Sequence, residues 1–129
     1  MTGRLAVLVV EDEPVNRALL RAVLERSSTE RLRDCHIVEA ANLAEARGSL
    51  LAQAFDVVIL DVRLPDGSGL TLARDLAANR QMPGQSVIVM SASVLPAERA
   101  EALTTGCDAF LAKPFQPSQL TDLLTRLTA

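Results

Sequence analysis

Residues 57–69 read VVILDVRLPDGSG: four apolar residues lead directly into Asp61, and a Pro-Asp-Gly turn follows. An uninterrupted apolar run of this kind is typical of a strand that is buried on both faces of a parallel sheet. A single aspartate at the end of a strand is usually a turn or helix-cap residue. Whether Asp61 carries chemistry therefore depends on which other side chains reach the same edge of the sheet.

The rest of the chain alternates between further strands and helical patterns. Apolar runs predict strands at 5–10, 35–40, 86–90 and 109–112 in addition to the strand at 55–60. Apolar residues at three- and four-residue spacing predict helices at 15–24, 43–50, 70–77, 96–105 and 117–127. Pro14 and Pro117 suit the first turns of two helices, and Asn42 with Glu45 forms an N-cap and N3 pair. The polar segment 26–34 is expected to be a surface loop.

Strands that alternate with helices predict an α/β fold, a (βα)5 doubly wound parallel sheet with helices on both faces. The length of 129 residues and the hydrophobic fraction of 49% suit a single packed domain over residues 1–129. The longest apolar run, 5–10, is too short to span a bilayer, and no secretory signal is visible. A cytoplasmic location is therefore expected.

Composition argues against several classes of function. The net charge is −3, and the chain has no basic stripe, Tyr or Trp, so direct nucleic-acid binding is not expected. The short apolar runs likewise predict no membrane partner. Cys35 and Cys107 lack CxxC spacing, which argues against a zinc site or a disulfide framework and favours two small buried hydrophobes. The single histidine, His36, lies among apolar residues at a strand start, where a structural role is favoured over a catalytic one.

Polar residues follow four of the five predicted strands, at the point where each strand ends. They are Glu11, Asp12 and Glu13 after the first strand, Asp61 after the third, Ser91 after the fourth and Lys113-Pro114 after the fifth. In open α/β sheets ligands bind beyond the carboxyl ends of the strands, so we expect these groups to meet at one edge. Crowded carboxylates need a cation, and oxygen ligands beside a phosphate favour Mg²⁺. An ammonium and a hydroxyl can neutralise phosphoryl oxygens, and an aspartate can act as the nucleophile.

Each of these groups has an ordinary structural explanation when it is taken singly. Asp61 could cap a turn, Glu11-Asp12 could be a solvated helix start, and Lys113-Pro114 could be a surface turn. Coincidence is a poor explanation for four such groups at successive strand ends with matching chemistry. The set as a whole therefore favours a phosphoryl-transfer site.

Four segments together resemble the receiver domain of two-component response regulators: VLVVEDEPVNR, DVVILDVRLPDGSGL, VIVMSAS and GCDAFLAKPF. The intervals from Asp12 to Asp61, from Asp61 to Ser91 and from Ser91 to Lys113 fit that family's pattern, and the resemblance covers essentially the whole chain. It implies a flavodoxin-like strand order of 2-1-3-4-5. It also implies that Asp61 is the phosphoacceptor and that a histidine kinase or a histidine phosphotransfer protein supplies the phosphoryl group.

The resemblance implies the metal ligands as well. Asp12 and Asp61 would bind Mg²⁺, with Mn²⁺ as a substitute, and Glu11 would act through a bound water. The backbone carbonyl of Arg63 would complete the protein ligands. Glu11 departs from the aspartate that is more frequent in the family, but its longer side chain can still reach a metal-bound water.

A switch is the third implication of the resemblance. Ser91 would move toward the phosphoryl group, Lys113 would pair with it, and Phe110 would follow Ser91 by changing its rotamer; a plain core aromatic is the alternative for Phe110. The Lys113-Pro114 bond is expected to be cis. Repacking of the surface made by the fourth helix, fifth strand and fifth helix would change the binding of a downstream protein or effector domain.

Two other classes of function stay open beside this one. A receiver-like interaction module without phosphorylation would not need the full acidic set and Lys113. A phosphatase with an aspartyl nucleophile favours an acid two positions later, where Arg63 stands and cannot serve. Neither GxGxxG nor GxxxxGK[ST] follows the first strand, which argues against nucleotide binding. We therefore expect no conventional enzyme but a domain that catalyses only its own phosphorylation and dephosphorylation.

Arg63 and the extent of the chain lead to two further expectations. We hypothesise that the Arg63 side chain lies over the site and alters the lifetime of the phosphoryl group by steering water; a solvent-pointing arginine is the alternative. No effector domain fits after the last helix. The chain is therefore expected to be either a stand-alone receiver or one cut from a longer regulator or hybrid sensor kinase, which EDEPVNRALL resembles.

Overall fold

The computed structural model describes residues 4–92 and 95–129, and its centre is a five-stranded parallel sheet. The strands are β1 (Ala6–Val10), β2 (His36–Ala40), β3 (Val57–Asp61), β6 (Ser86–Ser91) and β7 (Ala109–Ala112). They lie in the order β2-β1-β3-β6-β7, and every neighbouring pair is parallel. Counted along the chain this is the order 2-1-3-4-5, so the expected doubly wound α/β fold is confirmed.

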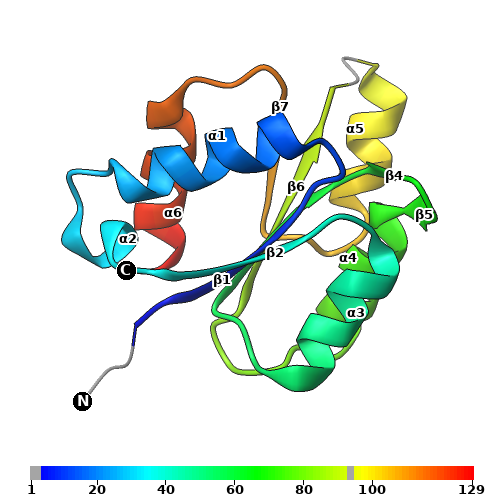
Figure 1. Ribbon diagram of the computed structural model, residues 1–129. Helices are drawn as coiled ribbons and strands as arrows, with labels where there is room; N and C mark the ends of the chain where they lie inside the picture. Colours follow the sequence, from blue (N-terminus) through cyan, green and yellow to red (C-terminus); the bar gives the residue numbers. More distant parts are fainter. Residues whose placement is uncertain (1–3, 93–94) are drawn as a thin grey trace.

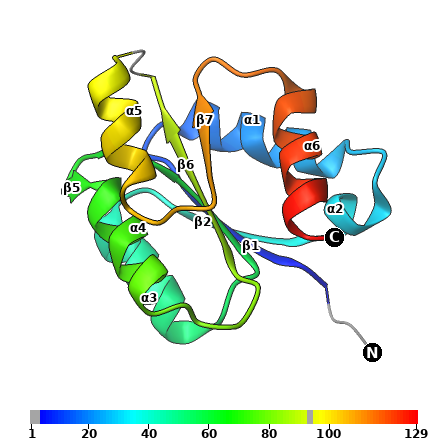
Figure 2. The same ribbon diagram turned by 180° about the vertical axis from the view of Figure 1, so that it is seen from behind.

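Helices cover both faces of the sheet, as Figure 1 and Figure 2 show. One layer contains α1 (Pro14–Glu25), α2 (Glu30–Arg33) and α6 (Pro117–Leu127), and the other contains α3 (Leu43–Ala52), α4 (Gly69–Ala78) and α5 (Pro96–Leu103). A short hairpin of β4 (Arg63–Leu64) and β5 (Gly67–Ser68) directly follows β3. Among the described residues, no helix has both the length and the apolar character needed to cross a membrane.

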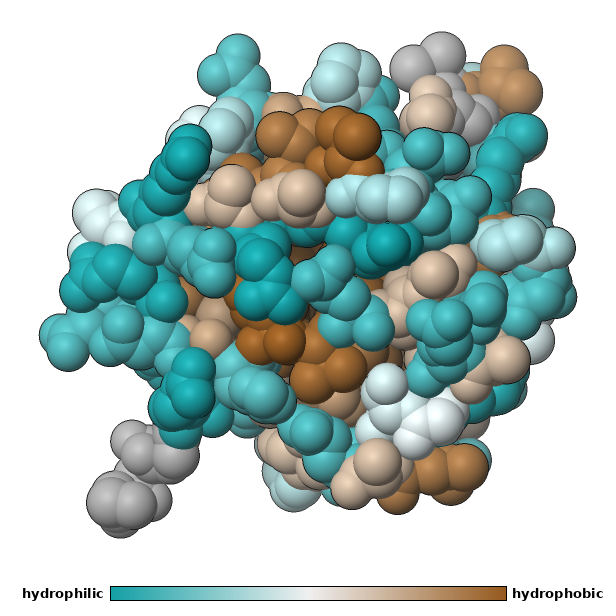
Figure 3. Space-filling model, viewed as in Figure 1, coloured by the Kyte–Doolittle hydropathy of each residue, from teal (hydrophilic) through white to brown (hydrophobic). Residues whose placement is uncertain are grey.

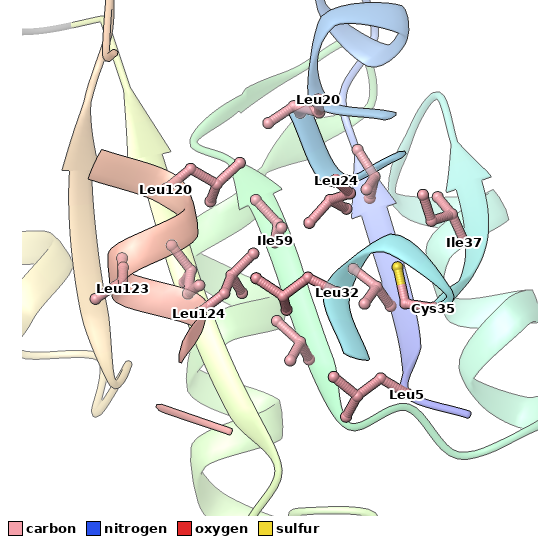
Figure 4. Close-up of a cluster of buried hydrophobic side chains, with 14 of the residues drawn as sticks. Leu5, Leu20, Leu24, Leu32, Cys35, Ile37, Ile59, Leu120, Leu123 and Leu124 are labelled. Carbon is pink, nitrogen blue, oxygen red and sulfur yellow. The ribbon is translucent and has the colours of Figure 1, made fainter. Parts of the chain in front are cut away.

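Two hydrophobic clusters fill the space between the sheet and its helical layers. In the layer of α1, α2 and α6, the buried side chains of Leu24, Leu32, Leu120 and Leu124 lie around Ile59 of β3 (Figure 4). The second cluster lies under α3, α4 and α5. Every residue of β3 and β6 is buried. Their apolar runs are uninterrupted because helices cover both faces of these central strands.

The helices α1, α3 and α6 begin where the sequence pattern predicts. Pro14 and Pro117 are the first residues of α1 and α6, where a missing backbone N–H costs nothing. The Asn42 side chain accepts a hydrogen bond from the Glu45 backbone N–H at 2.8 Å, which confirms the predicted cap of α3. The helix expected at 96–105 ends earlier, at Leu103.

The segment 26–34 is not merely a surface loop, and this expectation was wrong. It contains α2, whose Leu32 is 1% exposed and packs within the cluster under α1 and α6. A single apolar residue among charged neighbours makes no periodic pattern, so composition alone concealed the helix. Cys35, which follows α2, is buried in the same cluster and packs as the expected small hydrophobe, whereas Cys107 is only half-buried against the cluster under α3, α4 and α5, so the expectation of burial was wrong for Cys107.

The carboxyl ends of the strands meet at one edge of the sheet. Asp61 pairs with Met90, the residue before Ser91, and the Lys113 N–H donates to the Ser91 carbonyl at 2.8 Å. Glu11 directly follows β1, the neighbour of β3. This register gathers the candidate residues from four strands at one edge.

Candidate functional site

At this edge an ammonium group lies between two carboxylates. Lys113 Nζ donates to Glu11 Oε1 at 2.6 Å and to Asp61 Oδ2 at 2.9 Å. The side chains of Lys113, Glu11 and Asp61 are 17%, 1% and 12% exposed, so water screens these contacts only weakly. Lys113 is the only lysine in the sequence. The fold thus places the single ammonium side chain of the chain against two of the predicted acidic residues.

Burial and charge both perturb ionisation here. Burial, reinforced by the Asp61 charge, raises the pKa of Glu11 above its ordinary value of 4.5 despite the hydrogen bond from Lys113. Burial alone would lower the pKa of Lys113, but its hydrogen bonds to Glu11 and Asp61 prevail and raise it above 10.5. Lys113 therefore keeps its positive charge, which offsets the repulsion between the carboxylates of Glu11 and Asp61.

The acidic residues could also hold a metal ion. Glu11, Asp12 and Asp61 each offer one oxygen, and these three oxygens lie within 4.8 Å of one another. Clustered carboxylate oxygens suit a hard divalent cation such as Mg²⁺, which keeps several of its waters. The predicted acidic set is thus brought together, while the Arg63 carbonyl as a further ligand stays a prediction.

Gly69, the first residue of α4, packs directly on the backbone of Asp61. A Cβ at position 69 would lie 1.9 Å from the Asp61 carbonyl oxygen, far inside van der Waals contact. The Gly69 N–H donates to the Val62 carbonyl at 2.7 Å. Only glycine allows so close an approach, so a side chain at position 69 would displace the backbone of Asp61.

The Ser91 hydroxyl is held by α5. It donates to Glu98 Oε1 at 3.0 Å, and Glu98 Oε2 lies 3.7 Å from the Arg63 guanidinium. Ser91 is 2% exposed, whereas the Arg63 side chain is 82% exposed. Arg63 therefore leans toward α5 while it remains largely in water, and its effect on a phosphoryl group stays a prediction.

Phe110 lies in β7 and is half-buried. Its ring packs against the cluster under α3, α4 and α5, and the Arg99 guanidinium carbon lies 5.6 Å from the ring centroid. The Lys113–Pro114 peptide bond three residues later is cis, as expected. The proposed switch role of Phe110 stays a prediction, since a core aromatic would pack in the same way.

Sequence reasoning assigns no role to two charged residues that contact the site. One is Glu98, described above. The other is Arg17, whose guanidinium donates to the carbonyls of Glu11 at 2.7 Å and Asp12 at 3.1 Å, while its Nε donates to Glu39 Oε1 at 3.2 Å. Arg17 thus clamps the backbone of the acidic loop. The segment EDEPVNR contains Arg17, but no spacing signal separates a backbone clamp from a surface arginine.

An apolar cleft opens beside Lys113. It has a volume of about 580 Å³, and its lining includes Leu19, Val23 and Phe115 besides Lys113. Val15 and Leu19 are 70% and 58% exposed, and Figure 3 shows a hydrophobic patch over the beginning of α1. A cleft with an exposed apolar margin next to a charged centre is the kind of surface that a protein partner covers.

Comparison with known proteins gives a family match over most of the chain. Residues 7–125 match the response regulator receiver domain. Response regulator Rre1 from Synechocystis sp. is 32% identical over 129 residues, which are 100% of this chain and 54% of that protein. The transcriptional regulatory protein KdpE from Escherichia coli is 37% identical over 114 residues, 88% of this chain and 47% of that protein. The chain thus spans about half the length of these relatives.

A solved structure of another response regulator is similar to this chain in fold. The response regulator protein TrrA from Thermotoga maritima, in complex with Mg²⁺-BeF, superimposes with a TM-score of 0.80 at 27% sequence identity. The superposition covers 95% of this chain and 98% of that one.

Proposed function

This chain belongs to the response regulator receiver domain family, and on that premise we propose that it is a phosphorylation-controlled switch whose phosphoacceptor is Asp61. The observation that carries the proposal is the contact of Lys113 with both Glu11 and Asp61, beside the acidic set Glu11, Asp12 and Asp61. Phosphoryl transfer depends mainly on positioning and charge neutralisation, which such a set provides.

In the proposed reaction a carboxylate oxygen of Asp61 attacks the phosphorus of a phosphohistidine on a partner protein. A P–O bond forms as the P–N bond breaks, and the histidine leaves with the electron pair. Lys113 and the Ser91 hydroxyl pair with the phosphoryl oxygens. Mg²⁺, or Mn²⁺ in its place, would be held by Asp12, Asp61, Glu11 through water and the Arg63 carbonyl, and would supply further charge neutralisation.

The output of the switch is a change of shape rather than a product. When the acyl phosphate draws Ser91 toward it, Phe110 turns inward, and the face made by α5, β7 and α6 repacks. A downstream protein or effector domain reads this face. On this account the domain acts on no separate substrate and catalyses only its own phosphorylation and dephosphorylation.

The phosphodonor is a histidine kinase or a histidine phosphotransfer protein in the cytoplasm. The apolar cleft beside Lys113 supports this part of the proposal, because a partner that covers it would bring a histidine close to Asp61. The chain is either a receiver on its own or part of a longer regulator or hybrid kinase.

Acetyl phosphate, a small phosphodonor, tests the proposal without any partner. With Mg²⁺ present, we expect the intact mass of the protein to rise by one phosphoryl group, and chelation by EDTA should prevent the increase. A protein that binds Mg²⁺ but never acquires an adduct would favour the interaction module without phosphorylation.

A further inference from the structure

We propose that Glu98 is a positioning residue that restrains the Ser91 hydroxyl and the Arg63 guanidinium in the unphosphorylated state. Phosphorylation of Asp61 would release both. This inference rests on the function proposed above. It adds a specific restraint, located on α5, that the phosphoryl group must break.

The restraint is visible as a bridge between three elements. Glu98 Oε1 accepts from Ser91 of β6 at 3.0 Å, and Glu98 Oε2 lies 3.7 Å from Arg63 of β4. The Glu98 side chain is 17% exposed, so its hydrogen bond with the buried Ser91 is well shielded from water. The pair with Arg63 is exposed and correspondingly weak.

Competition follows from the chemistry of a hydroxyl. Ser91 has one O–H, which can donate to Glu98 or to a phosphoryl oxygen at any moment, but not to both. The Arg63 guanidinium can likewise turn from a carboxylate to a phosphoryl group with more negative charge. The free energy of the Ser91–Glu98 bond therefore opposes the phosphorylated state and favours the resting state.

Glu98 is well placed to pass this change to α5. It lies in the first turn of the helix, two residues after Pro96, which begins the helix. A carboxylate here is favoured by the helix dipole even without Ser91, so release need not unfold the turn. Loss of the bridge removes one contact that ties the first turn of α5 to β6, on the face that we assign to the output.

The test measures the affinity for beryllofluoride, which takes the place of a phosphoryl group on a carboxylate, in the presence of Mg²⁺. Fluorine-19 NMR of the bound probe provides the dissociation constant. We expect Glu98→Ala to bind roughly five- to tenfold more tightly, since one charge-assisted hydrogen bond no longer has to be broken. Glu98→Gln, which retains a weaker acceptor, should lie between Glu98→Ala and the parent.

A matched control and a double-mutant cycle isolate the mechanism. Glu101→Ala removes a carboxylate from the same helix, one that pairs with Arg74 at 3.6 Å, and should leave the affinity within about twofold of the parent. In a Ser91→Ala background, Glu98→Ala should lose most of its effect because the hydroxyl that Glu98 restrains is already absent. Amide shifts of α5 in ligand-free Glu98→Ala should move toward those of the beryllofluoride-bound parent.

The outcomes separate this inference from the proposed function. If the parent binds no beryllofluoride, or binds it equally after Asp61→Asn, the proposed function fails and the inference fails with it. If the parent binds and Glu98→Ala changes nothing, only the inference is wrong. If Glu98→Ala tightens binding equally with and without Ser91, the effect is general charge repulsion and the inference is overturned.

Discussion

Lys113 Nζ lies 2.9 Å from Asp61 Oδ2, so the ammonium already contacts the carboxylate that we assign as phosphoacceptor. The same nitrogen donates to Glu11 at 2.6 Å. Lys113 therefore does two things: it offsets the repulsion between two buried carboxylates, and it stands where a phosphoryl oxygen would need a positive charge.

Lys113→Ala should destabilise the protein when no divalent cation is present. Removing the ammonium leaves Glu11 and Asp61 without their partner, and we expect the free energy of unfolding to fall by about 2–4 kcal/mol. Mg²⁺ should restore more stability to the variant than it adds to the parent, because it replaces the lost charge. Urea unfolding with and without Mg²⁺ measures both effects.

Arg80→Ala provides the control for that experiment. Arg80 pairs with Asp108 at 2.9 Å, away from the candidate metal site. Loss of this ion pair should lower the free energy of unfolding, and Mg²⁺ should not restore it. Equal responses of the two variants to Mg²⁺ would contradict the assigned role of Lys113.

Gly69→Ala should disturb Asp61 through the backbone. The new Cβ would collide with the Asp61 carbonyl oxygen at 1.9 Å, and we expect a loss of about 1–3 kcal/mol of stability together with slower phosphorylation. Gly48→Ala in α3 is the matched control. Its Cβ would meet no described heavy atom within 4 Å, so it should stabilise the helix by about 0.5–1 kcal/mol and leave phosphorylation unchanged. Thermal unfolding and phosphorylation rates of both variants check this.

Arg17→Ala should weaken Mg²⁺ binding although Arg17 is not expected to bind the ion. Without the clamp on the Glu11 and Asp12 carbonyls, the acidic loop loses its fixed position, and we expect roughly a tenfold lower affinity by calorimetric titration. Arg21→Ala removes a neighbour that shares the Glu39 contact at 2.7 Å. If Arg21→Ala weakens Mg²⁺ binding as much as Arg17→Ala does, the backbone clamp is not the cause.

Asp66 should make stability sensitive to acid. Hydrogen bonds from the backbone N–H groups of Leu43 and Ala44 lower the pKa of Asp66 below its ordinary value of 3.8. As pH falls below about 3.8, Asp66 takes up a proton more readily in the unfolded state, so this contribution to stability disappears through that window. Asp66→Asn should flatten the dependence there.

Urea unfolding at several pH values measures this dependence. Asp122→Asn, which changes an exposed aspartate on α6, is the control variant. A slope in Asp66→Asn as steep as in the parent would show that the contacts with the start of α3 do not depend on the charge of Asp66.

Arg63→Ala should shorten the lifetime of the phosphoryl group. The guanidinium lies near Glu98 at the margin of the site, and we expect its removal to admit water and to accelerate dephosphorylation by a few-fold. Decay of the adduct after removal of acetyl phosphate measures this rate. Equal rates for the variant and the parent would end the idea that Arg63 steers water.

The sequence predicted the parallel sheet and the meeting of the candidate site residues at one edge of it, because both follow from where the apolar strands run and end. Uninterrupted apolar runs marked β3 and β6, and the polar residues that follow them, Asp61 and Ser91, had to share one edge once the strands were parallel. The carboxylates, the hydroxyl and the ammonium at this edge then favoured phosphoryl transfer over other kinds of chemistry. These inferences needed no knowledge of distances.

Other features could not be predicted because they depend on contacts between distant segments. Leu32 gave no periodic signal, yet it anchors α2 in the core. Asp66 was expected only to turn the chain, but its carboxylate also accepts hydrogen bonds from the backbone N–H groups of the first two residues of α3. Arg17 and Glu98 look like ordinary surface charges until the fold brings them to backbone carbonyls and to Ser91.

The most direct test of the central claim is the intact mass of three proteins after exposure to acetyl phosphate and Mg²⁺: the parent, Asp61→Asn and Asp66→Asn. Asp66 is the matched control because it is an exposed aspartate in the turn between β4 and β5, five residues after Asp61. We predict one phosphoryl group on the parent and on Asp66→Asn, and none on Asp61→Asn. An adduct that survives Asp61→Asn, or one that disappears only in Asp66→Asn, would contradict the assignment of Asp61 as the phosphoacceptor.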